Sequence, residues 1–158
     1  MNQEEYSHYL AKASQLCARK EKCEQDIRQK FIQWGIHDQD QDRLIEQLKD
    51  SDFINHQRYA VAFARDKMRF NHWGINKITY ALRNKNIEDL YIQHSINQLP
   101  KQQYDAILLE ELEKKRPRIK AQNAREKKNK LCQFLIQKGF EHGKVFELVE
   151  KKLKEYED

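Results

Sequence analysis

Glycine and proline are scarce in this sequence of 158 residues, which has four glycines and two prolines. A sheet fold with many tight turns uses both residues often, so their scarcity favours helices. Long hydrophobic runs are missing as well, because the hydrophobic residues, 39% of the chain, occur in spaced pairs. No stretch approaches the roughly 20 apolar residues that cross a bilayer, and we expect no membrane segment. The composition therefore predicts an all-α protein.

Cysteine is also rare. Cys17, Cys23 and Cys132 are too few and too irregularly placed for a disulfide framework, and no two of them form a C-x-x-C pair. Cys17 and Cys132 lie in apolar helical patterns, so we expect both in the core. The first residues are polar and acidic, unlike a signal peptide. We expect a reducing, cytoplasmic location.

Motifs for catalysis and metal binding are absent. Neither of the common glycine-rich phosphate loops occurs, and no serine lies in a nucleophile elbow. Asp38, Asp40 and Asp42 open like a calcium-binding loop, but Arg43 and Lys49 replace its required glycine and glutamate. The histidines lack metal-ligand spacing, which leaves surface or capping roles. We predict a binding protein with no enzymatic activity, cofactor or metal.

Positive charge is concentrated in the second half of the chain. The formal net charge is +5 at pH 7, yet residues 1–50 carry more acid than base. Between residues 114 and 130, Glu126 is the only acidic residue, and the basic residues are Lys114, Lys115, Arg116, Arg118, Lys120, Arg125, Lys127, Lys128 and Lys130. This basic run is either an ordinary solvated face or a surface that attracts polyanions or an acidic protein.

The spacing of apolar residues predicts nine helices. They are expected at residues 4–20, 23–34, 40–49, 55–70, 74–84, 88–98, 101–115, 120–138 and 142–156. Gly35 should end the second helix, and Asn55 should cap the fourth. Pro100 suits the first turn of the seventh helix, and Pro117 should break the chain between the seventh and eighth.

The same apolar pattern occurs three times. Ile27, Phe31 and Ile36 are followed 51 residues later by Ile78, Leu82 and Ile87, and 53 residues after those by Leu131, Leu135 and Phe140. This register indicates three tandem three-helix repeats, at residues 1–50, 51–99 and 100–158. Because a bundle of about fifty residues buries little surface, neighbouring repeats should pack together. We predict an elongated, curved right-handed or solenoid-like array.

One predicted helix in the central repeat carries two stripes. Arg65 and Arg69 fall within roughly 20° of Arg58 around that helix, while Tyr59, Phe63 and Phe70 cluster about 120° away. We predict a buried aromatic face beside an exposed cationic one. The arginines are either a solvated face, a binding surface, or structural partners of Asp52 or Asp66.

Four motifs carry a family resemblance. The central repeat contains F-I-N-H-Q-R-Y-A-V-A-F-A-R-D-K at residues 53–67 and W-G-I-N-K-I-T-Y-A-L at residues 73–82. The first repeat adds A-R-K-E-K-C-E-Q-D-I at residues 18–27, and the third adds F-L-I-Q-K-G-F at residues 134–140. Together these motifs resemble those of the bacterial RecX regulatory proteins. The chain departs from the family at Asn55-His56, where an acidic pair is usual, and at Cys23, where Ser or Thr is usual.

The resemblance implies a regulator built from tandem three-helix repeats. RecX proteins bind the RecA recombinase, usually as its filament on DNA, and inhibit its ATPase and strand exchange in recombination and DNA repair. We therefore expect as partners the RecA filament and, weakly through phosphates, single- or double-stranded DNA, with no membrane. We also expect a monomer. The residues predicted to bind are Arg58, Arg65, Arg69, Lys77, Arg83, Lys127, Lys128 and Lys130. The alternative is a sequence-indifferent DNA- or RNA-binding module that acts without RecA.

Overall fold

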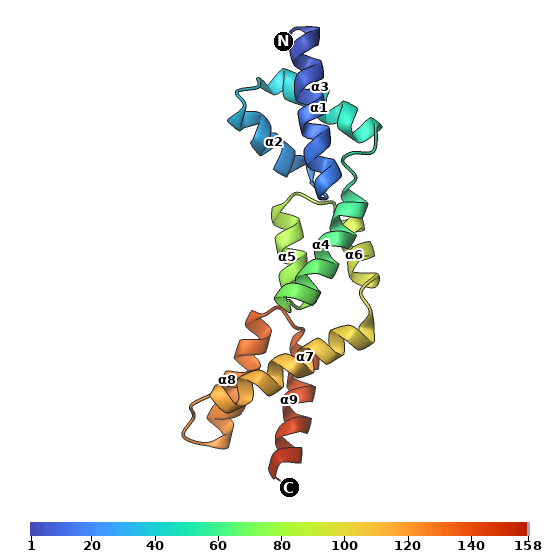
Figure 1. Ribbon diagram of the computed structural model, residues 1–158. Helices are drawn as coiled ribbons and strands as arrows, with labels where there is room; N and C mark the ends of the chain where they lie inside the picture. The colour runs from blue at the N-terminus through green and yellow to red at the C-terminus, as the bar shows by residue number, and fades with distance from the viewer. Residues whose placement is uncertain (158) are drawn as a thin grey trace. The chain divides into compact units, whose positions relative to one another are not determined.

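The computed structural model describes residues 1–157, and helices are the only regular secondary structure in that range (Figure 1). The elements are α1 (Gln3–Arg19), α2 (Glu24–Gln33), α3 (Asp38–Asp50), α4 (His56–Asn71), α5 (Ile75–Asn84), α6 (Asp89–Asn97), α7 (Lys101–Lys115), the 3-10 helix η1 (Arg116–Arg118), α8 (Ala124–Gln137) and α9 (His142–Glu157). The predicted all-α class is confirmed, and every predicted helix has a counterpart.

The chain forms two compact units. The first contains residues 1–62 and 82–95, and the second contains residues 63–81 and the chain from residue 96 onward. The central predicted repeat thus contributes to both units. The repeat boundaries after residues 50 and 99 and the curvature of the array stay predictions. Below, the helix triplets are α1–α3, α4–α6 and α7–α9.

Helices α1, α2 and α3 build the core of the first unit. Its buried residues include Ala13, Cys17, Ile27, Phe31, Ile36, Leu44, Ile45, Leu48 and Ile54. Trp34 packs against this core, and its ring centroid lies 5.9 Å from those of Tyr9 and Phe31. Cys17 and Cys132 are buried as predicted. Burial, and then the neighbouring Glu21 carboxylate, raises the pKa of the Cys17 thiol to about 11.

The second helix of each triplet ends in the same way. A residue with positive φ follows it in each case: Gly35 (74°), Asn86 (58°) and Gly139 (99°). The N–H of the next residue then donates back into the helix, from Ile36 to Phe31 O at 3.0 Å, from Ile87 to Leu82 O at 3.1 Å and from Phe140 to Leu135 O at 3.2 Å. This is a left-handed C-cap sealed by an apolar residue. Gly35 was predicted to end its helix, and Asn86 takes the same role because asparagine tolerates positive φ.

Burial follows the predicted repeat register. In α2, α5 and α8 the register positions are filled by side chains that are at most 1% exposed: Ile27, Phe31, Ile78, Leu82, Leu131 and Leu135. The repeat register aligns Ile92 and Val145 with Gln41 of the first triplet, and Gln41 is also buried. The Gln41 side-chain amide donates to Ile36 O at 2.8 Å, so this buried polar group is satisfied.

The first junction between triplets is a cap supplied by a neighbouring helix. The Glu24 N–H at the start of α2 donates to His56 Nε2 at 3.1 Å. His56 Nδ1 in turn lies 2.9 Å from a Glu88 carboxylate oxygen. The first N–H groups of a helix have no partner within it, so His56 from α4 satisfies one of them. The capping role expected for a histidine is found here.

The second junction repeats this arrangement with different side chains. The Ile75 N–H at the start of α5 donates to the Tyr104 hydroxyl at 3.1 Å, and that hydroxyl donates to Glu141. Tyr104 is buried, being 4% exposed, and its ring centroid lies 5.6 Å from that of Phe140. The first helix of a triplet thus again caps the second helix of the preceding one.

The second junction also brings two backbones into contact. The Gly74 N–H donates to Lys138 O at 2.8 Å, and the Asn76 N–H donates to Gly139 O at 2.9 Å. A Cβ on Gly74 would lie 2.2 Å from the Gly139 carbonyl carbon, and a Cβ on Gly139 would lie 2.4 Å from Lys77 Cβ. Only glycine permits such a close approach.

Asn55 has its predicted role at the start of α4, whereas Pro100 does not lie in the first turn of α7. The Asn55 side chain accepts from the Arg58 N–H at 2.9 Å, which makes it the cap of α4. Pro100 was predicted in the first turn of the seventh helix, but it is the residue before that helix. Its extended ψ of 116° keeps it outside the helix, which starts at Lys101.

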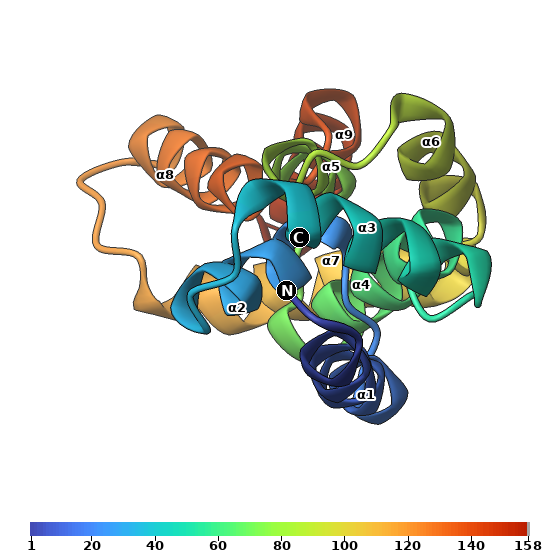
Figure 2. The same ribbon diagram turned by 90° about the horizontal axis from the view of Figure 1, so that it is seen from above.

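The connection between α7 and α8 is longer than predicted. Pro117 breaks the chain as expected and lies in η1. Helix α8 begins at Ala124, one turn later than the sequence pattern placed it. The Asn123 side chain sets this start by accepting from the Glu126 N–H at 2.8 Å, and residues 119–123 form a loop (Figure 2).

Candidate functional site

Arg58 is tied into ion pairs at the start of α4. Its Nη1 lies 2.9 Å from Asp52 Oδ2, its Nη2 donates to Asp52 O at 2.8 Å, and its Nε pairs with Glu21. Glu21 and then Asp52 raise the pKa of Arg58, while Asn55 and then Arg58 lower the pKa of Asp52. Asp52 has a positive φ of 61°, so Arg58 fastens a strained turn between α3 and α4. These contacts support the structural interpretation of Arg58.

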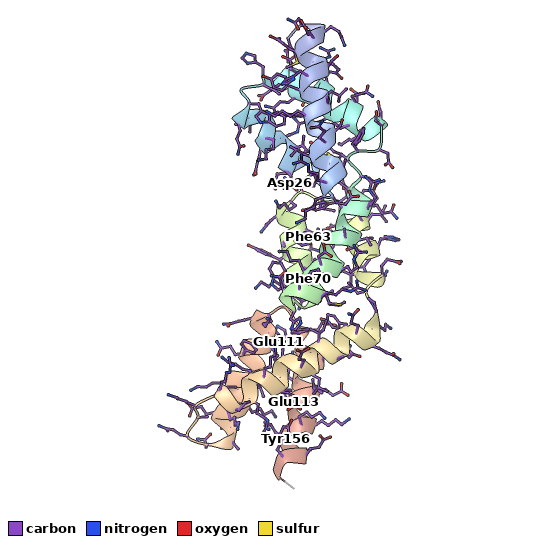
Figure 3. All side chains as sticks on the ribbon, viewed as in Figure 1. Asp26, Phe63, Phe70, Glu111, Glu113 and Tyr156 are labelled. Atoms are coloured by element: carbon purple, nitrogen blue, oxygen red, sulfur yellow. The ribbon has the colours of Figure 1, made fainter. Side chains whose placement is uncertain are left out.

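Arg65, Arg69 and Phe70 are exposed residues of α4, and we call these three the α4 patch. Figure 3 labels Phe70 on this helix. Arg65 Nε lies 3.8 Å from Asp66 Oδ1, and both side chains are nearly half exposed, so this ion pair is weak. Phe70 was predicted on the buried aromatic face, but it is 80% exposed. That prediction is wrong for Phe70, although it holds for the buried Tyr59.

Trp73, which follows α4, packs back onto that helix. His72 has a positive φ of 55°, which turns the chain back so that the Trp73 N–H donates to Lys67 O at 3.1 Å. The Trp73 ring then packs on Phe63, with 6.4 Å between centroids. The Lys67 and Lys77 ammonium groups lie 4.8 and 4.7 Å from the Trp73 ring centroid. Lys77 therefore makes a cation–π contact.

Ion pairs partly neutralise the basic run. Lys128 Nζ lies 3.1 Å from Glu150 Oε1, and Lys130 Nζ lies 2.9 Å from Glu126 Oε1. These lysines lower the pKa of the Glu150 and Glu126 carboxyl groups. Lys130 Nζ also donates to Lys120 O at 2.7 Å, which fastens the loop before α8 to that helix.

The remaining predicted residues lie on other elements. Arg83 Nε lies 3.4 Å from Asp89 Oδ1, between two side chains that are mostly exposed. Lys127 lies on α8 and is partly buried. Arg58 and Arg83 belong to the first compact unit, and the other six predicted residues belong to the second.

A cavity of about 500 Å³ lies beside the basic run, and the sequence patterns did not reveal it. It is lined by Lys115, Arg118, Ile119, Lys120, Lys130, Gln133, Phe134 and Gln137. Lys115 Nζ lies 4.8 Å from the Phe134 ring centroid. The spacing of residues 130, 133, 134 and 137, which places them on one helix face, is the signal that could have found this surface.

The aspartates near residue 40 have structural roles. Asp38 and Asp40 lie in the first turn of α3, where they complement its free N–H groups. Asp42 lies 2.8 Å from Arg28 Nη2. Within residues 1–157, no three histidine, cysteine or acidic side chains gather as a metal site. No helix in that range combines the length and apolarity that crossing a bilayer requires.

Two family models match the chain. One, described as "RecX, second three-helix domain", matches residues 55–95, and the other, "RecX, third three-helix domain", matches residues 102–149. The two segments together cover more than half of the 158 residues. This chain belongs to the RecX family. The RecX matches lie within the second and third predicted repeats.

Curated RecX relatives from Bacillus align with most of the chain. "Regulatory protein RecX" of Bacillus cereus is 28% identical over 160 residues, which cover 99% of this chain and 57% of the relative. The protein of the same name from Bacillus thuringiensis is 29% identical over 115 residues, which cover 73% of this chain and 42% of the relative. The chain thus spans about half the length of these RecX relatives.

Solved RecX structures share the fold. The crystal structure of RecX from Lactobacillus salivarius has a TM-score of 0.80 at 22% identity, covering 96% of this chain and 97% of that chain. A second crystal structure of regulatory protein RecX has a TM-score of 0.80 at 21% identity, covering 92% of this chain and 73% of that chain. The helical architecture is therefore that of known RecX structures.

Proposed function

We propose that this protein binds the RecA recombinase filament on DNA and inhibits or modulates its ATPase and strand exchange in recombination and DNA repair. Membership of the RecX family supports this proposal, because the curated relatives carry the name regulatory protein. The observation that carries it is the α4 patch, in which Arg65 and Arg69 are exposed and Phe70, on an adjoining side of the same helix, is 80% exposed. Arginine and aromatic residues are enriched at protein interfaces. The protein acts without catalysis, as a cytoplasmic monomer.

The proposed mechanism is insertion of the three repeats, as a curved array, into the groove of the filament. Arg65 and Arg69 meet DNA phosphates or acidic side chains of the recombinase, and Phe70 packs on an apolar part of its surface. Lys127 and Lys128 add positive charge from α8. Arg58 contributes indirectly, because its ion pairs hold the turn that precedes α4.

Charge reversal in the α4 patch tests the proposal. The double variant Arg65→Glu/Arg69→Glu, with Arg58 kept, should retain its helicity, because both side chains are exposed. Its inhibition of ATP hydrolysis by RecA on single-stranded DNA should require a roughly tenfold higher concentration, since charges at an interface govern association. Circular dichroism and a coupled ATPase assay provide the two measurements.

The matched control for this test is Lys151→Glu/Lys154→Glu. Both lysines are exposed on α9, and the control changes the net charge by the same amount. It should inhibit as the unmodified protein does. Equal inhibition by the two double variants, or no inhibition by the unmodified protein at a saturating concentration, contradicts the proposal.

The cationic cavity beside α8 favours a second candidate function, which is binding of DNA or RNA without RecA. Salt separates the two candidates. Binding that depends on phosphates alone weakens steeply as salt rises, whereas a protein interface with apolar contacts retains its affinity. Salt-sensitive binding to nucleic acid, with no effect on the recombinase, would favour this second function.

A further inference from the structure

The cavity beside α8 is built by three consecutive segments of the second compact unit. Lys115 ends α7, Arg118 ends η1, and Lys120 belongs to the loop that follows. The opposite wall is one face of α8. Pro117 restricts the backbone just before Arg118, and the hydrogen bond from Lys130 Nζ to Lys120 O fastens Lys120 to α8. The segment from residue 118 to residue 120, which lines the cavity, is therefore held on both sides.

Positive charge dominates the lining. It contains four cationic side chains and no carboxylate. Glu126 balances Lys130 at 2.9 Å, so Lys115, Arg118 and Lys120 are the main source of the local field. A concentration of one charge sign in a hollow raises the local concentration of ligands of the opposite sign. The cavity is suited to an anion.

The uncharged lining residues indicate what kind of anion fits. Sites for small molecules are mostly apolar and enclose the ligand, whereas most side chains here are polar and exposed. The Phe134 ring offers a surface for stacking a base, and the Gln133 and Gln137 amides both donate and accept hydrogen bonds, as base edges do. A lone phosphate has no base to stack on the ring, and neither has an acidic peptide. Single-stranded nucleic acid uses both the ring and the amides.

We propose that this cavity binds a segment of single-stranded DNA, with Arg118 and Lys120 on its phosphates and Phe134 stacked on a base. In the free protein Lys115 Nζ lies over the Phe134 ring, 4.8 Å from its centroid; the base takes this place on binding, and Lys115 then pairs with a phosphate. This inference rests on the proposed function and deepens it. The cavity takes the DNA strand, while the α4 patch takes the recombinase.

Fluorescence anisotropy of a labelled oligothymidylate, titrated over a salt series without recombinase, tests the proposal. For Arg118→Ala/Lys120→Ala, the slope of log affinity against log salt should fall by about 1.4, since each phosphate contact on a single strand contributes about 0.7. Phe134→Leu keeps an apolar side chain but removes the ring. It should lower the affinity at least about fivefold and leave the salt slope unchanged.

The control is Lys101→Ala/Lys151→Ala, which removes the same charge from exposed positions outside the cavity and should preserve the slope. Equal slopes for the cavity and control variants overturn the proposal, as does unchanged affinity in Phe134→Leu. Duplex DNA bound as tightly as the single strand, or polyglutamate competing equally per charge, also overturns it. Because no recombinase is present, these failures leave the RecA proposal standing, and the ATPase assay tests that separately.

Discussion

Gly74 and Gly139 pack backbone against backbone, and a single methyl group is enough to disturb this contact. In Gly74→Ala the new Cβ would lie 2.2 Å from both Gly139 C and Phe140 N, neither of which can move without breaking the junction. We expect the free energy of unfolding to fall by about 3 kcal/mol, and the Tm by roughly 6–12 °C. Thermal unfolding followed by circular dichroism measures the change.

Gly143→Ala provides the matched control at the residue scale. Gly143 lies in α9, and no atom lies within 4 Å of its added Cβ. Alanine is a better helix former than glycine, so the free energy of unfolding of this variant should rise by up to about 1 kcal/mol. A Gly74→Ala protein that unfolds at the temperature of the unmodified protein would show that the backbone contact is not required.

At the scale of helices, the Tyr104 hydroxyl is the group that joins α7 to the start of α5. Burial, and then the hydrogen bond to Glu141, raises the pKa of Tyr104, so the hydroxyl keeps its proton and donates it. Tyr104→Phe leaves the Ile75 N–H and the Glu141 carboxylate without this partner. The free energy of unfolding should fall by about 1–3 kcal/mol, and urea unfolding measures it. Tyr80→Phe, at a side chain that is 68% exposed, should change stability by less than about 0.5 kcal/mol. Equal effects in the two variants would rule out the cap.

The helices could be predicted because their signals are local. Apolar spacing and single residues such as Gly35 and Asn55 act within a few positions of the chain. Spacing placed Phe70 on the same face as Phe63, but the ring that packs on Phe63 is that of Trp73, which follows the left-handed His72. Helical spacing alone does not predict such a contact.

The candidate sites were less accessible to sequence reasoning than the helices. The cavity draws its lining from α7, η1, a loop and α8, so no single sequence pattern contains it. Of the three lysines in the basic run that were predicted to bind, Lys127, Lys128 and Lys130, only Lys130 lines the cavity. Ion pairs such as that of Arg58 with Glu21 join residues far apart in sequence, and periodicity carries no information about them.

At the scale of the whole molecule, partly buried carboxylates link stability to pH. Burial opposes the ionisation of Asp26, but Lys85 Nζ at 2.7 Å and the Cys23 N–H at 3.3 Å outweigh it and lower its pKa. Burial also opposes the ionisation of Glu24, and Lys49 and then Arg28 outweigh it in the same direction. Folding therefore lowers the pKa of both carboxyl groups.

We expect the free energy of unfolding to decrease on acidification below about pH 4. A carboxyl group with a lower pKa in the folded state makes the unfolded chain bind more protons as the pH falls. The stabilisation is complete above the unfolded value of about 4 and is lost as the pH falls through the folded value. Asp26→Asn should lower the free energy of unfolding by about 1–2 kcal/mol at neutral pH. On acidification, the free energy of unfolding of this variant should decrease less than that of the unmodified protein. Urea unfolding across this pH range measures both, and an unchanged acid response in Asp26→Asn contradicts the prediction.

The junction at α5 also limits how segments can be exchanged between relatives. Three successive N–H groups, those of residues 74–76, find their acceptors on Lys138, Tyr104 and Gly139, which all belong to the last triplet. A hybrid gene whose crossover lies near Pro100 would take these donors from one parent and their acceptors from the other. A crossover within α4, after His56 and before Gly74, leaves each of these N–H groups and its acceptor in one parent and should give folded hybrids more often.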